Sequence, residues 1–444
     1  MQNSAFTAAF PRLFVQFLDR LPACFQRRRG RLGPAAVFLT LVTMSVLEKR
    51  SYARALEQIR LGLGARLGWE HDEPTRSAFC QARKKLLGSE CVDAFYAIRS
   101  VATRARELPR ATFHGYRIYA LDGTKLNLPI SPALVKKFGC PSNRKATECP
   151  QAGLVLLWDV GANQPVAWEL GPCNLSERGA GARLFEHLGP DVVMLGDRGL
   201  PGLEFFYLAR QRKAHYVIRM NTTSVAKTKE FCDFITSSDQ ERIVTFDPVV
   251  NKYRRFPGDA PLTVRFVRDP KKPDSVLATS FLDAAVTAAE FWQLYGKRWE
   301  IETAIREGKQ WHGLEDFHAR YVDGIHQEVA AIMTYLHLTS ELEVEMRHKV
   351  IERVAKGEEP PESANHIPYR FNRLLMADMV VGLIMTALTK PEILADEWAH
   401  CIRSLWRNRD RIRPGRSYPR TCKSPRGLTR RAKFSRNGRN NTGN

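Results

Sequence analysis

The sequence predicts an α/β fold in which helices flank a mixed sheet. Between residues 116 and 220, short apolar runs alternate with helical patterns, the order that is typical of α/β domains. Two further runs, Gln151 to Trp158 and Gln164 to Glu169, lie on either side of Gly161-Ala-Asn163 and predict an antiparallel hairpin. A hairpin next to strand–helix units indicates a sheet with both parallel and antiparallel strands.

Charge is distributed unevenly along the 444 residues, a length that predicts two or more domains. Residues 1–115 carry 19 Lys and Arg against 9 Asp and Glu, and residues 401–444 carry 14 against 1. The two ends therefore have net charges of +10 and +13, and of the total of +21 the middle is left with −2. Basic ends around a neutral body favour a partner that is a polyanion such as DNA. The alternatives are a basic protein with no such partner and a protein that binds membrane surfaces.

Several classes of protein are disfavoured. The nine cysteines include no Cys-x-x-Cys pair, and their odd number speaks against a complete disulfide framework. No Cys/His cluster has the spacing of a zinc site. Residues 5–26 are interrupted by charges, unlike a secretory signal. The apolar run Met379 to Leu388 is about half as long as a membrane-spanning helix. We expect a cytoplasmic protein without a membrane partner.

Helical patterns dominate the N-terminal region. Phe6, Phe10, Phe14 and Phe17 predict a helix over residues 1–28, and residues 35–62 predict another. Thr75 is a candidate cap for a helix from Arg76 to Leu87. That helix is rich in basic residues and is a candidate for DNA contact, with a packing helix as the alternative; these residues are Arg76, Arg83, Lys84 and Lys85.

Two predicted strands end in a carboxylate. The apolar run Tyr116 to Asp122 is followed by Gly123, and Val192 to Gly196 is followed by Asp197. The position where a buried strand gives way to a turn is a common place for catalytic groups in sheets covered by helices. The alternative is that each Asp only forms a turn.

A third carboxylate belongs to a polar arc on a predicted helix. With Tyr295 at 0° and about 100° per residue, Arg298, Glu302 and Lys309 fall near 300°, 340° and 320°. The four side chains therefore share an arc of about 60°. Glu300 and Glu307 fall well outside it, so this geometry selects Glu302. The alternative is a solvated amphipathic helix with ordinary ion pairs.

The remaining segments complete the expected organisation. Short β-rich runs with turn residues between them occupy residues 225–283. Helices are predicted over 325–344, 369–389 and 391–406. From residue 407 on, Arg, Lys, Gly, Pro, Ser and Asn dominate, which predicts a disordered basic tail.

Three motifs together resemble one family. They are Leu-Asp122-Gly-Thr, Gly-Asp197-Arg-Gly, and Tyr295-x2-Arg298-x3-Glu302-x6-Lys309. In this order they resemble bacterial insertion-sequence transposases of the DDE superfamily, in the IS-four-type group that is defined by the Tyr-Arg-Glu-Lys signature. The similarity extends over roughly residues 50–345, and one departure is Ile305, where the family more often has Phe. The resemblance implies a ribonuclease-H-like core with a strand-rich insertion between the second Asp and the Glu.

These observations give a domain plan. It consists of an N-terminal helical DNA-binding domain (1–115), a ribonuclease-H-like core in two parts (116–224 and 284–345) separated by the β-rich insertion (225–283), a C-terminal helical region (346–406) and the basic tail (407–444).

The resemblance also implies the chemistry of the site. Asp122, Asp197 and Glu302 would be catalytic and would hold Mg²⁺, with Mn²⁺ as a substitute; carboxylates without Cys or His suit such hard cations. Asp122 would bridge two ions, as in two-metal sites. Tyr295, Arg298 and Lys309 would bind DNA phosphates, although an ion pair with a core carboxylate, or packing in the case of Tyr295, is the alternative.

The implied activity is cut-and-paste transposition. Such an enzyme binds the inverted repeats of a transposon, cleaves the DNA and joins the ends to a target, as a homodimer on double-stranded DNA. The family stacks a flipped base on an aromatic side chain; Phe266, Phe281 and Trp292 are open candidates. The alternatives are a nuclease of the same fold without strand transfer and a non-catalytic DNA-binding descendant. A bacterial, nucleoid-associated location is expected.

Overall fold

The computed structural model describes residues 32–47, 51–67, 69, 74–104, 111–141, 149–200, 202–221, 228–246, 261–364 and 368–412. Within these residues the main sheet has nine strands. Eight of them lie in the order β4-β3-β2-β5-β6-β9-β8-β7, and β1 pairs with β2. The strands are β1 (Thr112–Phe113), β2 (Tyr116–Asn127), β3 (Gln151–Asp159), β4 (Gln164–Pro172), β5 (Val192–Gly196), β6 (His215–Arg219), β7 (Glu241–Phe246), β8 (Leu262–Asp269) and β9 (Lys272–Thr279).

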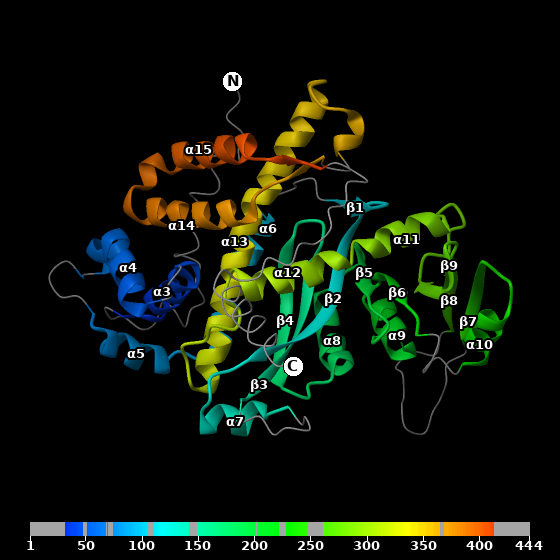
Figure 1. Ribbon diagram of the computed structural model, residues 1–444, viewed down its shortest axis with the longest axis horizontal. Helices are drawn as coiled ribbons and strands as arrows, with labels where there is room; N and C mark the ends of the chain where they lie inside the picture. Colours follow the sequence, from blue (N-terminus) through cyan, green and yellow to red (C-terminus); the bar gives the residue numbers. More distant parts are fainter. Residues whose placement is uncertain are drawn as a thin grey trace, which may run out of the picture.

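The first five strands of this order form the centre of the fold (Figure 1). β4, β3 and β2 are joined antiparallel, whereas β5 pairs parallel with β2 and β6 pairs parallel with β5. The predicted hairpin is β3–β4, and its turn places Asn163 at φ 54°, a left-handed conformation that Asn tolerates better than most residues. Three antiparallel strands followed by two parallel ones make the mixed sheet of a ribonuclease-H-like core. The predicted fold class is confirmed.

Side chains of the central strands alternate between two apolar cores. In β2, Ile118 and Ala120 enter one core, and Tyr119 and Leu121 enter the other. Helices cover both faces, so both faces of the strands must be apolar. α6 (Gly88–Arg104), α11 (Ala288–Gly296), α12 (Trp299–Gln310) and α13 (Val322–Ala355) contribute to the first core, and α8 (Glu177–Leu184), α9 (Leu203–Gln211) and α10 (Lys229–Thr236) to the second.

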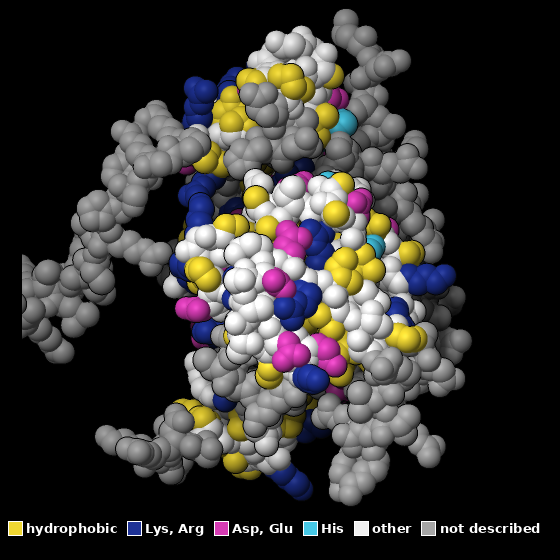
Figure 2. All heavy atoms as spheres, turned by 90° about the vertical axis from the view of Figure 1, so that its right-hand side faces the viewer, with side chains coloured by type: hydrophobic (Ala, Val, Ile, Leu, Met, Phe, Trp, Pro, Cys, Tyr) yellow, Lys and Arg dark blue, Asp and Glu magenta, His cyan; other side chains and the backbone are white. Residues whose placement is uncertain are grey.

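The predicted insertion extends the sheet. β9 pairs with β6, β8 with β9, and β7 with β8, all antiparallel. The prediction that the last strand rejoins the core sheet is confirmed, and the other two strands follow it into the same sheet. Figure 2 shows this end of the molecule, where acidic and basic side chains lie close to one another. Ion pairs such as Arg242–Asp239, at 2.5 Å, and Arg265–Glu241 balance the charge of these strands.

The N-terminal helices pack on α13, which is central in Figure 1. The single helix predicted over 35–62 is wrong: the structure has α3 (Pro34–Val46) and α4 (Tyr52–Leu67), and the backbone at Leu47 is extended. Thr75 caps α5 (Arg76–Lys84) as predicted, because its Oγ1 accepts the Ala78 N–H at 3.1 Å. The helix predicted over residues 1–28 lies outside the described residues.

Arg83 does not face DNA as predicted. It lies one turn after the buried Phe79 on the same face of α5, and its own side chain is buried. Its Nη2 pairs with Glu328 Oε1 on α13 at 2.7 Å, and its Nε donates to Gln327 at 2.8 Å. Arg76, Lys84 and Lys85 are exposed. The basic surface of α5 is therefore smaller than the sequence suggested.

The C-terminal helices α14 (Arg373–Thr389) and α15 (Leu394–Arg407) lie against α13 (Figure 1). α14 begins four residues later than predicted because Asn372 caps it, accepting the Leu375 N–H at 3.0 Å. Among the described residues, no helix combines the length and the apolar character needed to cross a bilayer. Most of the predicted basic tail lies outside the described residues. The remaining elements are α7 (Pro132–Phe138), the short 3-10 helices η1 (Phe185–His187), η2 (Pro361–Ala364) and η3 (Pro391–Ile393), and the paired strands β10 (Tyr369–Arg370) and β11 (Asp410–Arg411).

Candidate active site

The two aspartates of the predicted site lie on neighbouring strands. Leu121 of β2 and Gly196 of β5 are partners in a parallel ladder, so Asp122 and Asp197 follow at matching positions. Adjacent strands are only about 4.8 Å apart, which brings the two residues together. β5 ends at Gly196, and the Gly199 N–H donates to Asp197 Oδ1 at 2.8 Å in the turn that follows. The fold thus places both carboxylates at one position in the sheet.

Helix α12 adds the third carboxylate. Glu302 lies four residues after Arg298, and the Arg298 Nη2 pairs with Glu302 Oε1, the i,i+4 geometry that the sequence predicted. Arg298 Nη1 lies 3.7 Å from Asp122 Oδ2. The Arg298 guanidinium, only 7% exposed, therefore joins the first and third carboxylates. Its Nε has no hydrogen-bond partner among the described residues, so these carboxylates do not satisfy it completely.

The electrostatics of Asp122 reflect this crowding. The pKa of Asp122 is raised to about 6, chiefly by burial, and the nearby charges of Asp197 and Glu302 contribute to this rise. The Arg298 guanidinium and the Gly123 N–H act in the opposite direction and lower the pKa. The Gly123 N–H donates to Asp122 Oδ1 at 2.9 Å. Asp122 is therefore a half-desolvated acid that interacts with both other predicted catalytic carboxylates.

The polar arc is divided between two helices. Tyr295 lies in the last turn of α11, which ends at Gly296. Helix α12 begins at Trp299, and Lys297 and Arg298 form the turn between the two helices. The single continuous helix assumed from the sequence is therefore wrong, although Arg298, Glu302 and Lys309 keep their common side. A capping box of Thr287 and Glu290 fixes the start of α11.

The three residues expected to bind DNA phosphates have protein partners here. Tyr295 is 8% exposed, packs edge-on against Trp292, and has the Arg298 guanidinium over its ring. Lys309 Nζ donates to the Lys125 carbonyl at 2.5 Å and pairs with Glu315 at 3.3 Å. Arg298 and Lys309 thus attach the two ends of α12 to β2, because Asp122 and Lys125 both belong to that strand.

A fourth acidic side chain lies at the site and was not predicted. Glu177, the first residue of α8, approaches Gly123: a Cβ added at that glycine would lie 2.9 Å from the Glu177 Cδ. Burial raises the pKa of Glu177, as do the charges of Asp197 and Asp122. No sequence motif marks Glu177. The closest available signal was Gly123 itself, because a glycine after Asp122 indicates that something approaches the backbone there.

Comparison with protein families identifies the chain. Residues 113–337, half of the sequence, match the family described as transposase DDE domain. The matched segment runs from β1 into α13 and includes Asp122, Asp197 and Glu302. The chain belongs to this family. The resemblance inferred from the three motifs is confirmed.

Two individual similarities were found. The chain is 26% identical over 296 residues to "Transposase InsG for insertion sequence element IS4" of Escherichia coli (strain K12), an alignment that covers 64% of this chain and 63% of that relative. Among solved structures, the piggyBac transposase in a synaptic complex with hairpin DNA aligns with 94% of this chain and 86% of that chain, at 10% identity and a TM-score of 0.40. The InsG similarity supports the insertion-sequence group within the family.

The donor atoms of the transposase site suit a divalent metal ion, which the family implies. All candidate ligands are carboxylate oxygens, and hard cations such as Mg²⁺ and Mn²⁺ prefer oxygen. In the described part of the chain, however, no three Asp, Glu, His or Cys side chains are close enough together to hold an ion. One Glu302 oxygen pairs with Arg298, which also lies near Asp122. The chemistry of the residues fits the ion, and Glu302 must exchange Arg298 for it.

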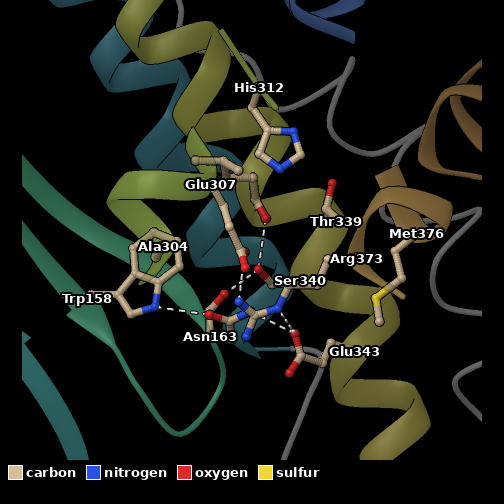
Figure 3. A pocket seen from close by; sticks show the side chains of 11 residues that line it. Trp158, Asn163, Ala304, Glu307, His312, Thr339, Ser340, Glu343, Arg373 and Met376 are labelled. Carbon is tan, nitrogen blue, oxygen red and sulfur yellow. Dashed lines mark hydrogen bonds and ion pairs between the residues drawn. The ribbon is translucent and has the colours of Figure 1, made fainter. Parts of the chain in front are cut away.

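The opposite side of α12 is anchored by a network of partly buried polar residues. Arg373 of α14 donates from Nη1 to Glu307 of α12 at 2.7 Å, and its Nε lies 3.6 Å from Glu343 of α13. Burial acts to lower the pKa of Arg373, but Glu343 and Glu307 raise it overall. Figure 3 shows these side chains around a cavity of about 30 Å³, with Asn163 donating to Glu343 at 2.7 Å. The network connects α12, which carries Glu302, to the C-terminal helix α14, to α13 and to the β3–β4 turn.

Proposed function

We propose that the chain is a cut-and-paste DNA transposase that binds the inverted-repeat ends of its element, cleaves them and joins them to target DNA. The observation that supports the proposal is that Asp122 interacts with both Asp197 and Glu302, from segments as far as 180 residues apart, and that Arg298 pairs with Glu302 and lies beside Asp122. Carboxylates are rarely gathered in this way without a cation.

Each carboxylate has a role in this proposal. With Mg²⁺ or Mn²⁺ bound, the site would activate water or a 3′-hydroxyl and stabilise the departing oxygen. Asp122 lies between the other two, so it is the residue to bridge two ions. Asp197 would complete the ligand shell on one side, and Glu302, after releasing Arg298, on the other.

We further propose that Arg298, Lys309 and Tyr295 bind phosphates of the DNA. In the structure Arg298 and Lys309 pair with the acidic residues Asp122, Glu302 and Glu315. Binding of cation and DNA would release both basic side chains, because the cation takes over the carboxylates and the phosphate offers a new anion. The buried Tyr295 would reach a phosphate only if the residues around it moved. Of the three proposed phosphate ligands, Tyr295 therefore requires the largest structural change.

The surroundings of the aromatic candidates for stacking a flipped base differ. Phe266 and Phe281 are buried in the two cores, and Trp292 packs against Tyr295. Trp299, the first residue of α12, is 63% exposed and lies next to Arg298. A stacking platform must be open to solvent before DNA binds. We therefore favour Trp299, which was not among the candidates from the sequence.

The proposal includes the partners and the location of the enzyme. Two transposon ends must be brought together, so we propose a homodimer on double-stranded DNA. The basic end regions, and the exposed Arg76, Lys84 and Lys85 of α5, would supply phosphate contacts. The location would be the bacterial cytoplasm, in association with the nucleoid.

A joining assay tests the proposed function. The full chain is incubated with Mg²⁺, labelled DNA carrying the inverted repeats that flank its gene, and a target plasmid. We expect joined products from the wild type, and more than about 10³-fold less cleavage from Asp122→Asn, Asp197→Asn and Glu302→Gln, because each removes a charged ligand. All three should still retard the labelled ends in gels. Cleavage without joining would instead indicate a nuclease, and binding without cleavage even with Mn²⁺ would indicate a non-catalytic protein.

A further inference from the structure

Glu177 is held at the site by two separate contacts of α8. Ser176 caps this helix, accepting the Gly179 N–H at 3.2 Å, and Glu177 follows as its first residue. The next residue, Arg178, donates to the carbonyl of Gly199 at 3.4 Å, in the turn after Asp197. On its other side, α8 packs on β2 and β3. The start of the helix is thereby fixed relative to both segments that carry the aspartates.

Gly123 explains why the carboxylate can come so close. Any side chain at position 123 would place a Cβ 2.9 Å from Glu177 Cδ and 3.0 Å from its Oε1, closer than carbon atoms approach in folded proteins. The backbone φ of Gly123 is not in the left-handed region, so the glycine leaves room for the Glu177 carboxylate and does not serve an unusual backbone conformation. The glycine of the Leu-Asp-Gly-Thr motif thus makes room for Glu177.

The Gly123 N–H acts on the Glu177 carboxylate as a hydrogen-bond donor, but this neutral group does not compensate the charge of Glu177. Within the part of the chain that the structure describes, no Lys, Arg or His side chain forms an ion pair with Glu177. Arg298 is the basic residue that acts on it, and Arg298 already pairs with Glu302 and lies beside Asp122. Three partly buried carboxylates, Asp122, Glu177 and Glu302, therefore depend on one guanidinium, and Asp197 adds a fourth negative charge beside Asp122 and Glu177. This arrangement is costly without additional positive charge.

We propose that Glu177 is a fourth carboxylate ligand of the divalent metal site, on the side formed by Asp122 and Asp197. This inference rests on the proposed function, because it assigns the residue to the same metal site. The contacts of α8 indicate this side of the metal site: its first residue, Glu177, approaches Gly123 next to Asp122, and its second, Arg178, donates to the Gly199 carbonyl in the turn after Asp197. Glu302 reaches Asp122 from α12 through Arg298.

Binding of Mn²⁺ alone provides the test. The full chain is titrated with Mn²⁺ without DNA, and free Mn²⁺ is measured by electron paramagnetic resonance. Loss of a residue that only supports a metal ligand typically costs about 10–100-fold in affinity, so we expect Glu177→Gln to weaken binding by at least about tenfold. The matched control is Glu186→Gln, on the segment that follows α8, where the carboxylate is 66% exposed.

The melting temperature without metal separates a ligand from a structural residue. Removing one of four crowded negative charges should leave the metal-free melting temperature of Glu177→Gln equal to or above that of the wild type. Mn²⁺ affinity equal to the wild type, or a melting temperature well below it, would overturn the proposal. The same Mn²⁺ titration of Asp122→Asn separates a failure of the proposed metal site from a failure of the Glu177 assignment. If Asp122→Asn also binds Mn²⁺ normally, the metal site of the proposed function is wrong; if only Glu177→Gln does, the assignment of Glu177 alone is wrong.

Discussion

At the residue scale, the ionised Asp122 carboxylate destabilises the folded protein, and a bound cation would offset this destabilisation. Its pKa is raised from 3.8 to about 6, chiefly by burial. An acid whose pKa is higher in the folded state than in the unfolded state favours folding when it is protonated. Its contribution to stability is therefore complete below about pH 4 and is lost as the pH rises through about 6. A bound cation would remove this loss by stabilising the carboxylate.

Asp122→Asn should accordingly stabilise the metal-free protein. Two pKa units correspond to about 3 kcal/mol at pH 7.5, and to much less at pH 4. Thermal unfolding in EDTA at both pH values measures the difference, with the exposed Asp274→Asn as the control. A variant that melts below the wild type at pH 7.5 would show that the Arg298 contact outweighs the burial of Asp122.

Arg83 provides a second prediction at this scale. Its side chain and that of Glu328 are 3% and 4% exposed, so Arg83→Met leaves a buried carboxylate without its partner. We expect a loss of about 3–5 kcal/mol in the free energy of unfolding. Adding Glu328→Gln should restore part of this loss, because the amide side chain is neutral and its one oxygen still accepts one of the two N–H groups, of His318 and Ala319, that Glu328 binds. Equal destabilisation in the single and double variants, measured by urea unfolding, would contradict the explanation.

At the scale of elements, the sequence predicted what depends on local pattern. The end of β5 before Asp197, the hairpin at Asn163 and the Arg298–Glu302 spacing follow from periods of two and 3.6 residues and from turn chemistry. The predicted strand end at Asp122 is wrong: β2 continues to Asn127 because it stays paired with β3, and only its pairing with β5 stops at Leu121. Contacts between distant segments could not be predicted in this way. Glu177 became part of the site only because α8 packs beneath β2.

The break between α11 and α12 also depends on contacts between distant segments and could not be predicted from local pattern. Lys297 and Arg298 have nearly helical backbone angles, so no proline or glycine of unusual conformation marks the turn. The position of the break is set by what each helix packs against. The burial of Arg83 was missed for a similar reason, since a basic residue on an apolar face is recognisable only when its partner Glu328 is known.

Arg373 tests whether the C-terminal helices position α12. Arg373→Met removes the partner of Glu307 and Glu343 and should lower stability by about 2 kcal/mol, less than for a fully buried pair because the Arg373 side chain is 23% exposed. We expect a lower cleavage rate with unchanged binding of DNA ends, because Glu302 shares α12 with Glu307. Arg370→Met, on the exposed β10, is the control. Unchanged cleavage at a temperature where the variant is folded would separate the C-terminal helices from catalysis.

At the scale of the whole molecule, one sheet collects residues from distant parts of the chain. β2 supplies Asp122, β5 leads to Asp197, and α12, which lies against β2, supplies Glu302. The strands of the insertion extend the same sheet, so the 105 residues between Asp197 and Glu302 do not separate them in space. This arrangement is the mixed sheet of a ribonuclease-H-like core, and it lies in the segment that matches the transposase DDE domain family.

Iron-mediated cleavage of the protein backbone tests this convergence most directly. Fe²⁺ takes the place of Mg²⁺, and ascorbate with peroxide then generates radicals that cut the chain near the bound ion. The account predicts cuts in all three segments, next to Asp122, Asp197 and Glu302, which excess Mg²⁺ suppresses together. Cuts near only one of these residues, or cuts elsewhere that Mg²⁺ suppresses, would contradict a shared metal site.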